Sequence, residues 1–210
     1  MATEKRDPIL ENVYSAKSND ELEQAYDAWA DRYDEDVFQR GYMLPAITAG
    51  YVGRHVPANA KIVDAGAGTG IIGRVLNGMG HDDITGFDLS NGMLKIARDT
   101  GVYTELDRQV IGEPLKYESN SFDACVSVGT FTEGHAPSSG FDEIARIVKP
   151  GGHFIVTIRP DIYENEGYQD KVAEMTKAGK MKLVEKSEKF RLFTEVDPHV
   201  QHCVFVYQVQ

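Results

Sequence analysis

The sequence contains few cysteines and comparatively few basic residues. Its 2 cysteines among 210 residues, Cys125 and Cys203, are too few for the disulfide framework of a small secreted domain, and we expect buried free thiols. Acidic residues outnumber lysine and arginine by 33 to 22, which gives a formal net charge of -11. Since phosphate backbones and anionic lipid surfaces attract clustered positive charge, we expect no nucleic acid and no membrane among the partners.

Long apolar runs and metal-ligand clusters are missing as well. No stretch approaches the roughly 20 apolar residues of a transmembrane helix, and the first 12 residues lack the apolar segment of a secretion signal. These features predict a cytoplasmic protein. The histidines are isolated and the cysteines far apart, so we predict no metal site. With 41% hydrophobic residues, the chain can bury the core of one domain.

Glycine is concentrated in one informative place. Residues 63–70 join a short apolar segment to Asp64 and to three closely spaced glycines, Gly66, Gly68 and Gly70, and residues 71–76 continue as an apolar helix start. Glycine tolerates positive φ angles and lets backbone N–H groups approach a ligand at the positive end of a helix. The stretch therefore predicts a strand, a cofactor-binding loop and a helix.

The acid in this stretch helps to choose between two cofactors. Residues 68–73 also satisfy the G-x-G-x-x-G pattern of dinucleotide sites. Asp64, two residues before the first glycine, would repel a pyrophosphate, whereas S-adenosylmethionine carries an ammonium and a sulfonium and no phosphate. Asp64 thus favours S-adenosylmethionine over NAD. Asp88, at the end of the next predicted strand, lies at the distance expected for a ribose-binding carboxylate, which suits either cofactor.

Taken in order, the motifs resemble those of a known family. The glycine-rich loop, Asp88, residues 121–123 and the Lys-Pro-Gly-Gly turn at 149–152 together resemble the class I S-adenosylmethionine-dependent methyltransferases over residues 20–160. The short sequence segments at 26–30, 33–34, 92–94, 112–115 and 128–134 are similar to segments of the methyltransferase-like proteins of the Williams-Beuren region type.

The resemblance implies a fold. We expect a three-layer, Rossmann-like α/β fold whose seven-stranded, mostly parallel sheet has a carboxyl-terminal antiparallel strand. The single domain, 1–210, would comprise a mobile lead (1–17), an amino-terminal helical lid (18–57) and a Rossmann-like core (58–210). Ser18 and Glu21 form a capping-box pattern that predicts the start of the lid helix. Further strands are expected at 107–111, 122–128, 154–158, 182–193 and 201–209, with a helix at 167–178.

The motifs assign candidate cofactor contacts. The resemblance places Tyr26 and Tyr33 in a lid over the cofactor, and places residues 111–113 where many relatives carry an adenine-binding acid. The first of those positions is here Ile111, which leaves adenine recognition to the residues after it. Met93 could instead fill the core. The candidate contacts for S-adenosylmethionine or its product S-adenosylhomocysteine are Tyr26, Tyr33, Asp64, Gly66, Ala67, Gly68, Thr69, Gly70, Asp88, Leu89, Ser90, Met93, Gly112, Glu113, Val128 and Gly129.

The acceptor is expected beyond the strand at 122–128, because ligands of open α/β sheets bind outside the carboxyl ends of the strands. Glu133 and His135 are candidate general bases there, although Glu133 could only orient the substrate and His135 could be exposed. Tyr33 is a third catalytic candidate. Trp29 could instead pack the core and Arg159 could be a rim charge. The candidate acceptor contacts are Trp29, Thr130, Phe131 and Arg159.

Together these features predict an S-adenosylmethionine-dependent methyltransferase that methylates an oxygen or nitrogen atom of a small molecule, as a monomer or homodimer. The alternatives are a catalytically silent cofactor-binding partner subunit, a protein or peptide methyltransferase, an aminopropyl transferase and an NAD-linked oxidoreductase. Fold alone does not choose among these activities.

Overall fold

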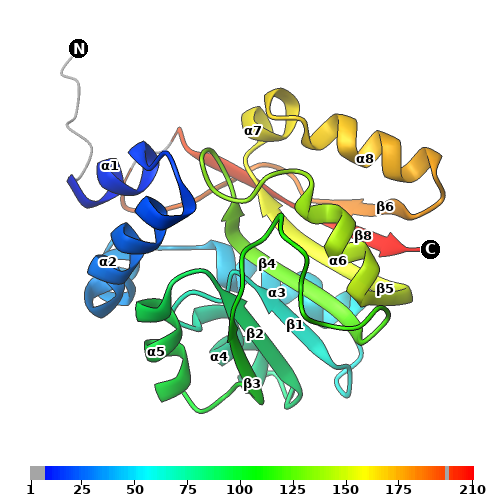
Figure 1. Cartoon of the computed structure of the whole chain (residues 1–210), viewed down its shortest axis with the longest axis horizontal. Coiled ribbons are helices and arrows are strands. Elements are labelled where there is room, and N and C mark those ends of the chain that lie inside the picture. Colours follow the sequence, from blue (N-terminus) through cyan, green and yellow to red (C-terminus); the bar gives the residue numbers. More distant parts are fainter. Residues whose placement is uncertain (1–7, 197–198) are drawn as a thin grey trace.

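A twisted β-sheet forms the centre of the molecule (Figure 1). The computed structural model describes residues 8–196 and 199–210, with the side chains of residues 8–11 excepted. The strands are β1 (Ile62–Ala65), β2 (Ile84–Asp88), β3 (Glu105–Arg108), β4 (Phe122–Phe131), β5 (Val148–Ile158), β6 (Met181–Lys186), β7 (Phe190–Arg191) and β8 (Gln201–Val209).

Helices cover both faces of this sheet (Figure 1). They are α1 (Pro8–Ser15), α2 (Asn19–Gln39), α3 (Leu44–His55), α4 (Ile71–Gly78), α5 (Asn91–Asp99), α6 (Gly140–Ile147), α7 (Pro160–Asn165) and α8 (Tyr168–Lys177). On one face, Phe141 of α6 packs against Phe154 of β5, and Tyr168 of α8 packs against Phe131 of β4. On the other face, Val52 of α3 and Leu76 of α4 belong to the apolar cluster beneath the sheet.

The strand order is β3-β2-β1-β4-β5-β8-β6, with the short β7 paired to β8. Strands β1 to β5 run parallel to their neighbours, while β8 runs antiparallel to β5 and to β6. The predicted three-layer fold and its carboxyl-terminal antiparallel strand are confirmed, but within the described residues the sheet has eight strands instead of seven, because the short β7 also pairs with β8. The chain moves outward from β1 through β2 to β3 and then returns to β4, so the direction of winding reverses between β1 and β4. A crevice forms at the carboxyl ends of strands where such a reversal occurs.

Two element boundaries differ from the prediction. The predicted strand at 182–193 is split into β6 and β7, because Ser187 interrupts the ladder with β8: its backbone N–H donates to Val204 and its hydroxyl accepts from the N–H of Val204. The third strand lies slightly earlier than residues 107–111. Helix α7 was not predicted; Pro160 occupies its first turn, where the absent N–H costs nothing.

The amino-terminal part also differs from a mobile lead over residues 1–17. Residues 1–7 lie outside the described residues, but residues 8–15 form α1, and Val13 is 3% exposed in a cluster with Leu22 and Trp29 of α2. The predicted start of α2 is confirmed, since the Ser18 hydroxyl accepts from the N–H of Glu21 at 3.2 Å. The amino-terminal helices thus pack on the molecule through an apolar-aromatic cluster of their own.

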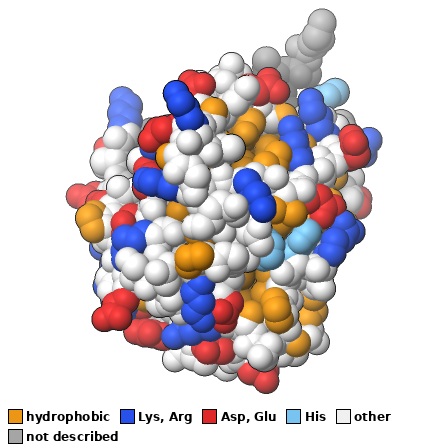
Figure 2. Space-filling model, turned by 90° about the vertical axis from the view of Figure 1, so that its right-hand side faces the viewer, with side chains coloured by type: hydrophobic (Ala, Val, Ile, Leu, Met, Phe, Trp, Pro, Cys, Tyr) orange, Lys and Arg blue, Asp and Glu red, His pale blue; other side chains and the backbone are white. Residues whose placement is uncertain are grey.

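The surface mixes charges of both signs. Figure 2 shows basic side chains scattered among acidic ones and small hydrophobic areas on the face it presents. Within the described part of the chain, no helix is both long enough and apolar enough to cross a membrane.

Candidate active site

The glycine-rich loop is fastened to β2. Gly66, Gly68 and Gly70 have φ angles of +79°, +54° and +87°, which favour glycine. The N–H groups of Gly66 and Ala67 both donate to the carbonyl of Phe87, at 2.8 and 3.0 Å. This pairing turns the loop over the end of the sheet and presents Gly68 to the crevice.

Asp88 connects this loop to the next helix. Its carboxylate accepts the N–H of Gly68 and that of Ser90, each at 2.9 Å. Burial raises the pKa of Asp88, and the hydrogen bonds from these two N–H groups oppose that rise. Ser90 in turn caps α5, because its hydroxyl accepts from the N–H of Met93 at 3.0 Å. Asp88, the predicted ribose-binding acid, therefore also fixes the shape of the glycine-rich loop next to the predicted ribose site.

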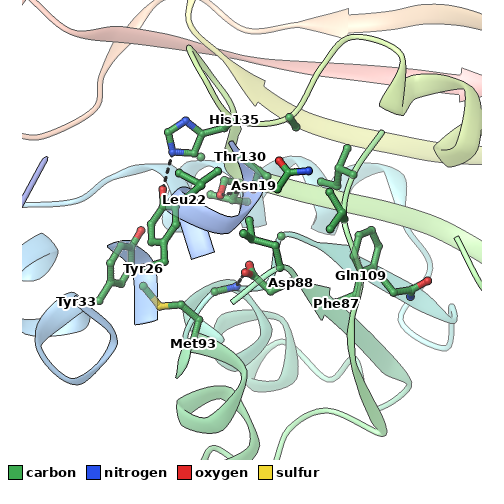
Figure 3. A pocket seen from close by; sticks show the side chains of 18 residues that line it. Asn19, Leu22, Tyr26, Tyr33, Phe87, Asp88, Met93, Gln109, Thr130 and His135 are labelled. Carbon is green, nitrogen blue, oxygen red and sulfur yellow. Dashed lines mark hydrogen bonds between the residues drawn. The ribbon is translucent and has the colours of Figure 1, made fainter. Parts of the chain in front are cut away.

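A first cavity lies between this loop and α2 (Figure 3). It encloses about 680 Å³, counting the part open to solvent. The predicted site residues that line it are Tyr26, Tyr33, Gly66, Gly68, Asp88, Leu89, Met93, Val128, Gly129, Thr130 and His135. Lining residues that the sequence reasoning missed are Asn19, Leu22, Phe87, Gln109, Val110, Ile111 and Ala136.

The first cavity fits S-adenosylmethionine. A Cβ atom placed on Gly68 would meet nothing within 4 Å, so this glycine leaves open space toward a ligand. The Asp88 carboxylate can accept hydrogen bonds from two ribose hydroxyls. The apolar side chains of Leu89, Met93 and Ile111 provide walls for an adenine ring.

Several predicted cofactor contacts lie elsewhere. Gly112 and Glu113 are exposed and outside the lining, and the three residues before them line the cavity instead. The chain turns at Gly112, where φ is +100° and the N–H of Glu113 donates back to Val110. Ala67 and Thr69 line a small neighbouring pocket, also bordered by Tyr33. Asp64, Gly70 and Ser90 line neither the first cavity, nor this small pocket, nor the second cavity described below.

Asp64 is fully buried beneath the loop. Its Oδ2 accepts the hydroxyl of Tyr103 at 2.7 Å, while its Oδ1 has no hydrogen-bond partner among the described residues. Burial raises the pKa of Asp64 to about 7, although the Tyr103 hydrogen bond opposes the rise. The Tyr103 ring occupies the space where a Cβ atom on Gly73 or Gly86 would be. Gly73, which completes the dinucleotide-like pattern, thus leaves room for the Tyr103 side chain to pack.

The buried Asp64 carboxyl predicts a pH-dependent stability. Its pKa rises from 3.8 to about 7 on folding, so the folded state retains a proton that the unfolded state releases between those values. The free energy of unfolding should therefore fall as the pH rises from about 4 to about 7, with no further change from this group at higher pH. Asp64→Asn removes this titration and keeps an oxygen that accepts from Tyr103. Urea unfolding of the cofactor-free protein should show the variant more stable than the wild type at pH 8 by on the order of 1 to 3 kcal/mol, with little difference at pH 4.

A parallel pH dependence in the two proteins would show that Asp64 is already ionised in the folded state. Asp99→Asn is a suitable control, because Asp99 is exposed at the end of α5.

Helix α2 forms the roof of the site and is fixed by two acids two turns apart. Asp27 accepts the hydroxyl of Ser90 at 2.5 Å and the N–H of Gly92 at 2.7 Å. Asp34 accepts the hydroxyl of Thr69 and pairs with Arg74. The seven-residue spacing places both carboxylates on one face of the helix. This spacing is the sequence signal that could have identified the roof contacts.

A hydrogen bond between Tyr26 and His135 joins the roof to the loop after β4 (Figure 3). The Tyr26 hydroxyl lies 2.8 Å from Nε2 of His135, and Nδ1 lies 2.7 Å from the carbonyl of Glu133. Since a carbonyl can only accept, Nδ1 carries the hydrogen and Nε2 accepts from Tyr26. Burial lowers the pKa of His135, which keeps the ring neutral. In this arrangement both ring nitrogens are occupied, so His135 connects structural elements and is not free to take a proton.

A second cavity of about 1100 Å³, counting the part open to solvent, adjoins the first. The two cavities share Tyr26, Tyr33 and Gly129. The predicted acceptor or catalytic residues Trp29, Glu133 and Arg159 line the second cavity. Burial raises the pKa of Tyr33, so its hydroxyl stays protonated and can donate where the cavities meet.

Phe131 does not belong to the acceptor site as predicted. Its side chain is buried, and its ring packs against those of Phe141, Phe154 and Tyr168. It ends β4 with its side chain in the core, whereas the preceding Thr130 lines the first cavity.

Comparison with known families and relatives agrees with this geometry. Residues 63–156 match the family model described as a methyltransferase domain. Methyltransferase-like protein 27 of Homo sapiens is 34% identical over 138 residues, covering 64% of this chain and 56% of the relative. The ubiquinone biosynthesis O-methyltransferase of Xylella fastidiosa is 26% identical over 121 residues, covering 55% of this chain and 49% of the relative. The chain spans about half the length of these relatives.

Solved structures share the fold at low sequence identity. A TehB-like S-adenosylmethionine-dependent methyltransferase from Corynebacterium glutamicum is 21% identical with a TM-score of 0.66, covering 89% of this chain and 99% of that one. The [4+2]-cyclase SpnF is 17% identical with a TM-score of 0.71, covering 92% and 97% of the two chains. A cyclase among these structures illustrates that this fold alone does not fix the reaction. The family match shows a methyltransferase domain over residues 63–156, and the solved structures show that the chain shares the fold of S-adenosylmethionine-dependent methyltransferases, which implies S-adenosylmethionine as the cofactor that the first cavity fits.

Proposed function

We propose that the protein transfers a methyl group from S-adenosylmethionine to an oxygen or nitrogen atom of a small molecule. The observation that carries this proposal is the junction of two cavities at Tyr26, Tyr33 and Gly129. One cavity has the residues expected around the cofactor, and the other has largely aromatic and apolar walls. A methyl group could pass between ligands that meet at this junction.

The cofactor supplies a methyl group on a positively charged sulfur, and the protein mainly has to align the acceptor with it and exclude water. Asp88 binds the ribose, and α2, held by Asp27 and Asp34, covers the site. The protonated hydroxyl of Tyr33 donates a hydrogen bond at the junction. The Glu133 carboxylate, at the mouth of the second cavity, accepts the proton that the acceptor atom loses.

The test begins with titration calorimetry of S-adenosylmethionine, S-adenosylhomocysteine and NADH. The proposal requires binding of the first two and no comparable binding of NADH. Screening small hydroxyl- and amine-bearing molecules should then detect acceptor-dependent release of S-adenosylhomocysteine. Comparable NADH binding, or cofactor binding without turnover on any acceptor, would count against the proposed transfer.

Once an acceptor is found, Glu133→Gln should slow turnover about tenfold while leaving cofactor affinity unchanged, because alignment supplies most of the acceleration and proton removal is secondary. Steady-state rates and calorimetry measure the two effects separately. Glu118→Gln, at an exposed position outside both cavities, is the matched control. Equal rates for Glu133→Gln and the wild type would remove Glu133 from the proton path.

A further inference from the structure

Aromatic rings form part of the wall of the second cavity, and the space beside them is called the aromatic slot below. Around Trp29, the Tyr33 ring stands edge-on at 4.7 Å and the Tyr26 ring lies nearly parallel at 6.3 Å, measured between ring centroids. Tyr42 and Phe193 form another ring pair of the lining, 5.8 Å apart. Aromatic faces and edges attract a planar ring more specifically than aliphatic walls do.

Two buried polar atoms in the same lining have no partner. His202 is 4% exposed and Thr132 is 7% exposed, and neither Nδ1 of His202 nor Oγ1 of Thr132 makes a hydrogen bond within the described residues. Buried polar atoms are normally paired, and leaving one unpaired costs about 1 to 3 kcal/mol. The pair therefore indicates a polar group that is supplied from outside the described residues.

The charges around these atoms favour a negative group. Arg159 lines the cavity with its side chain 24% exposed, and it holds Asp161, which is 56% exposed, through Nε and Nη2 at 3.1 and 2.5 Å. Within the part of the chain that the structure describes, its Nη1 makes no hydrogen bond to another residue. Among the described lining residues, the one carboxylate is that of Glu133, while Arg159 supplies a cation beside the two buried polar atoms, in a protein with a net charge of -11.

His202 is a neutral partner for such a group. Burial and the neighbouring Arg159 lower the pKa of His202 to about 4. The imidazole therefore stays uncharged near neutral pH and can donate one hydrogen bond without adding a charge. The Thr132 hydroxyl can donate a second.

We propose that the second cavity binds a planar aromatic carboxylic acid as the methyl acceptor, with its ring in the aromatic slot and its carboxylate toward Arg159, His202 and Thr132. The nucleophilic hydroxyl or amine then lies toward the wall shared with the first cavity. This assignment rests on the proposed function, since it names the acceptor class for the same site.

Trp29 provides a direct binding signal that does not depend on turnover. It is the single tryptophan of the chain and lines the second cavity. Its fluorescence is followed while 4-hydroxybenzoate, its neutral analogue 4-hydroxybenzamide, or the non-planar acid cyclohexanecarboxylate is added to protein saturated with S-adenosylhomocysteine. Saturation with S-adenosylhomocysteine is first verified by calorimetry.

The aromatic acid should change the Trp29 signal with half-saturation at least about tenfold lower than that of the amide or the non-planar acid, because the acid alone combines a stacked ring with a charge-assisted contact. Arg159→Gln should raise the half-saturating concentration of the aromatic acid to that of the amide. Arg159→Lys should retain part of the difference between the two ligands. His202→Phe, which keeps an aromatic ring, should weaken binding of the aromatic acid several-fold. Arg98→Gln, at an exposed position of α5, should behave as the wild type.

Equal half-saturation of the acid and the amide overturns the acid assignment, and equal half-saturation of the two acids overturns the aromatic assignment. Bound S-adenosylhomocysteine without a Trp29 response to any probe overturns the acceptor class and leaves the proposed methyl transfer intact. Failure of S-adenosylhomocysteine to bind rejects the proposed function and this inference together.

Discussion

Asp88→Ala should weaken the binding of S-adenosylhomocysteine about 100-fold or more in titration calorimetry. The carboxylate would lose its hydrogen bonds to the ribose, each worth about 1.5 to 3 kcal/mol when one partner is charged. The same change removes the acceptor for the N–H groups of Gly68 and Ser90. The glycine-rich loop and the start of α5 then lose the hydrogen bonds that hold them in place. Binding therefore loses both direct contacts and the preformed shape of the loop.

Two further variants separate these contributions. Asp88→Asn keeps the shape of the side chain but not its charge, so its affinity should fall between those of the wild type and the alanine variant. Asp99→Ala makes the same chemical change at an exposed position of α5 and should bind as the wild type. Unchanged affinity in Asp88→Ala would reject the ribose assignment.

Gly66→Ala should lower the free energy of unfolding by about 3 kcal/mol. At φ +79° a side chain adds roughly 1 to 2 kcal/mol of backbone strain. Its Cβ atom would also lie 2.3 Å from Oγ1 and 2.6 Å from Cγ2 of Thr130, a clash that typically costs about 1 to 3 kcal/mol. Urea unfolding measures the loss, and adding Thr130→Ala should recover the part that is due to the clash.

Gly68→Ala provides the comparison within the same loop. Its φ angle of +54° also disfavours a side chain, but its Cβ would meet no atom within 4 Å. The stability loss should therefore be limited to roughly 1 to 2 kcal/mol of strain. Because Gly68 lines the first cavity, this variant should instead lose affinity for S-adenosylhomocysteine. Equal stability losses for the two variants would show that the contact between Gly66 and Thr130 is not tight.

The parts of the site that sequence predicted are those encoded locally. A strand, three glycines and an acid at the next strand end lie within one stretch of chain, and the capping pattern at Ser18 needs four residues. Gly112 and Glu113 lie outside the cavity lining because the direction of a turn depends on what packs against it, here Pro137, with which a Cβ atom at Gly112 would clash. Likewise, the aromatic core around Phe131 is assembled from distant elements.

The second cavity was the least predictable part. Trp29 and Arg159 were candidates for it, but His202 and Phe193 reach it from the far end of the chain through the pairing of β8 with β5 and the loop before β8. No spacing in the sequence connects these residues with α2. Only the sheet order, in which the last long strand returns next to β5, brings them together.

The origin of the two cavity walls along the chain has an evolutionary consequence. The glycine-rich loop and Asp88 fall within the matched domain at 63–156, whereas the second cavity, apart from Gly129, Thr132 and Glu133, is built from residues 13–44 and 159–202. The cofactor site and the acceptor site can therefore diverge separately. Related proteins could acquire different acceptors through changes in these two outer segments while inheriting one unaltered site for the methyl donor.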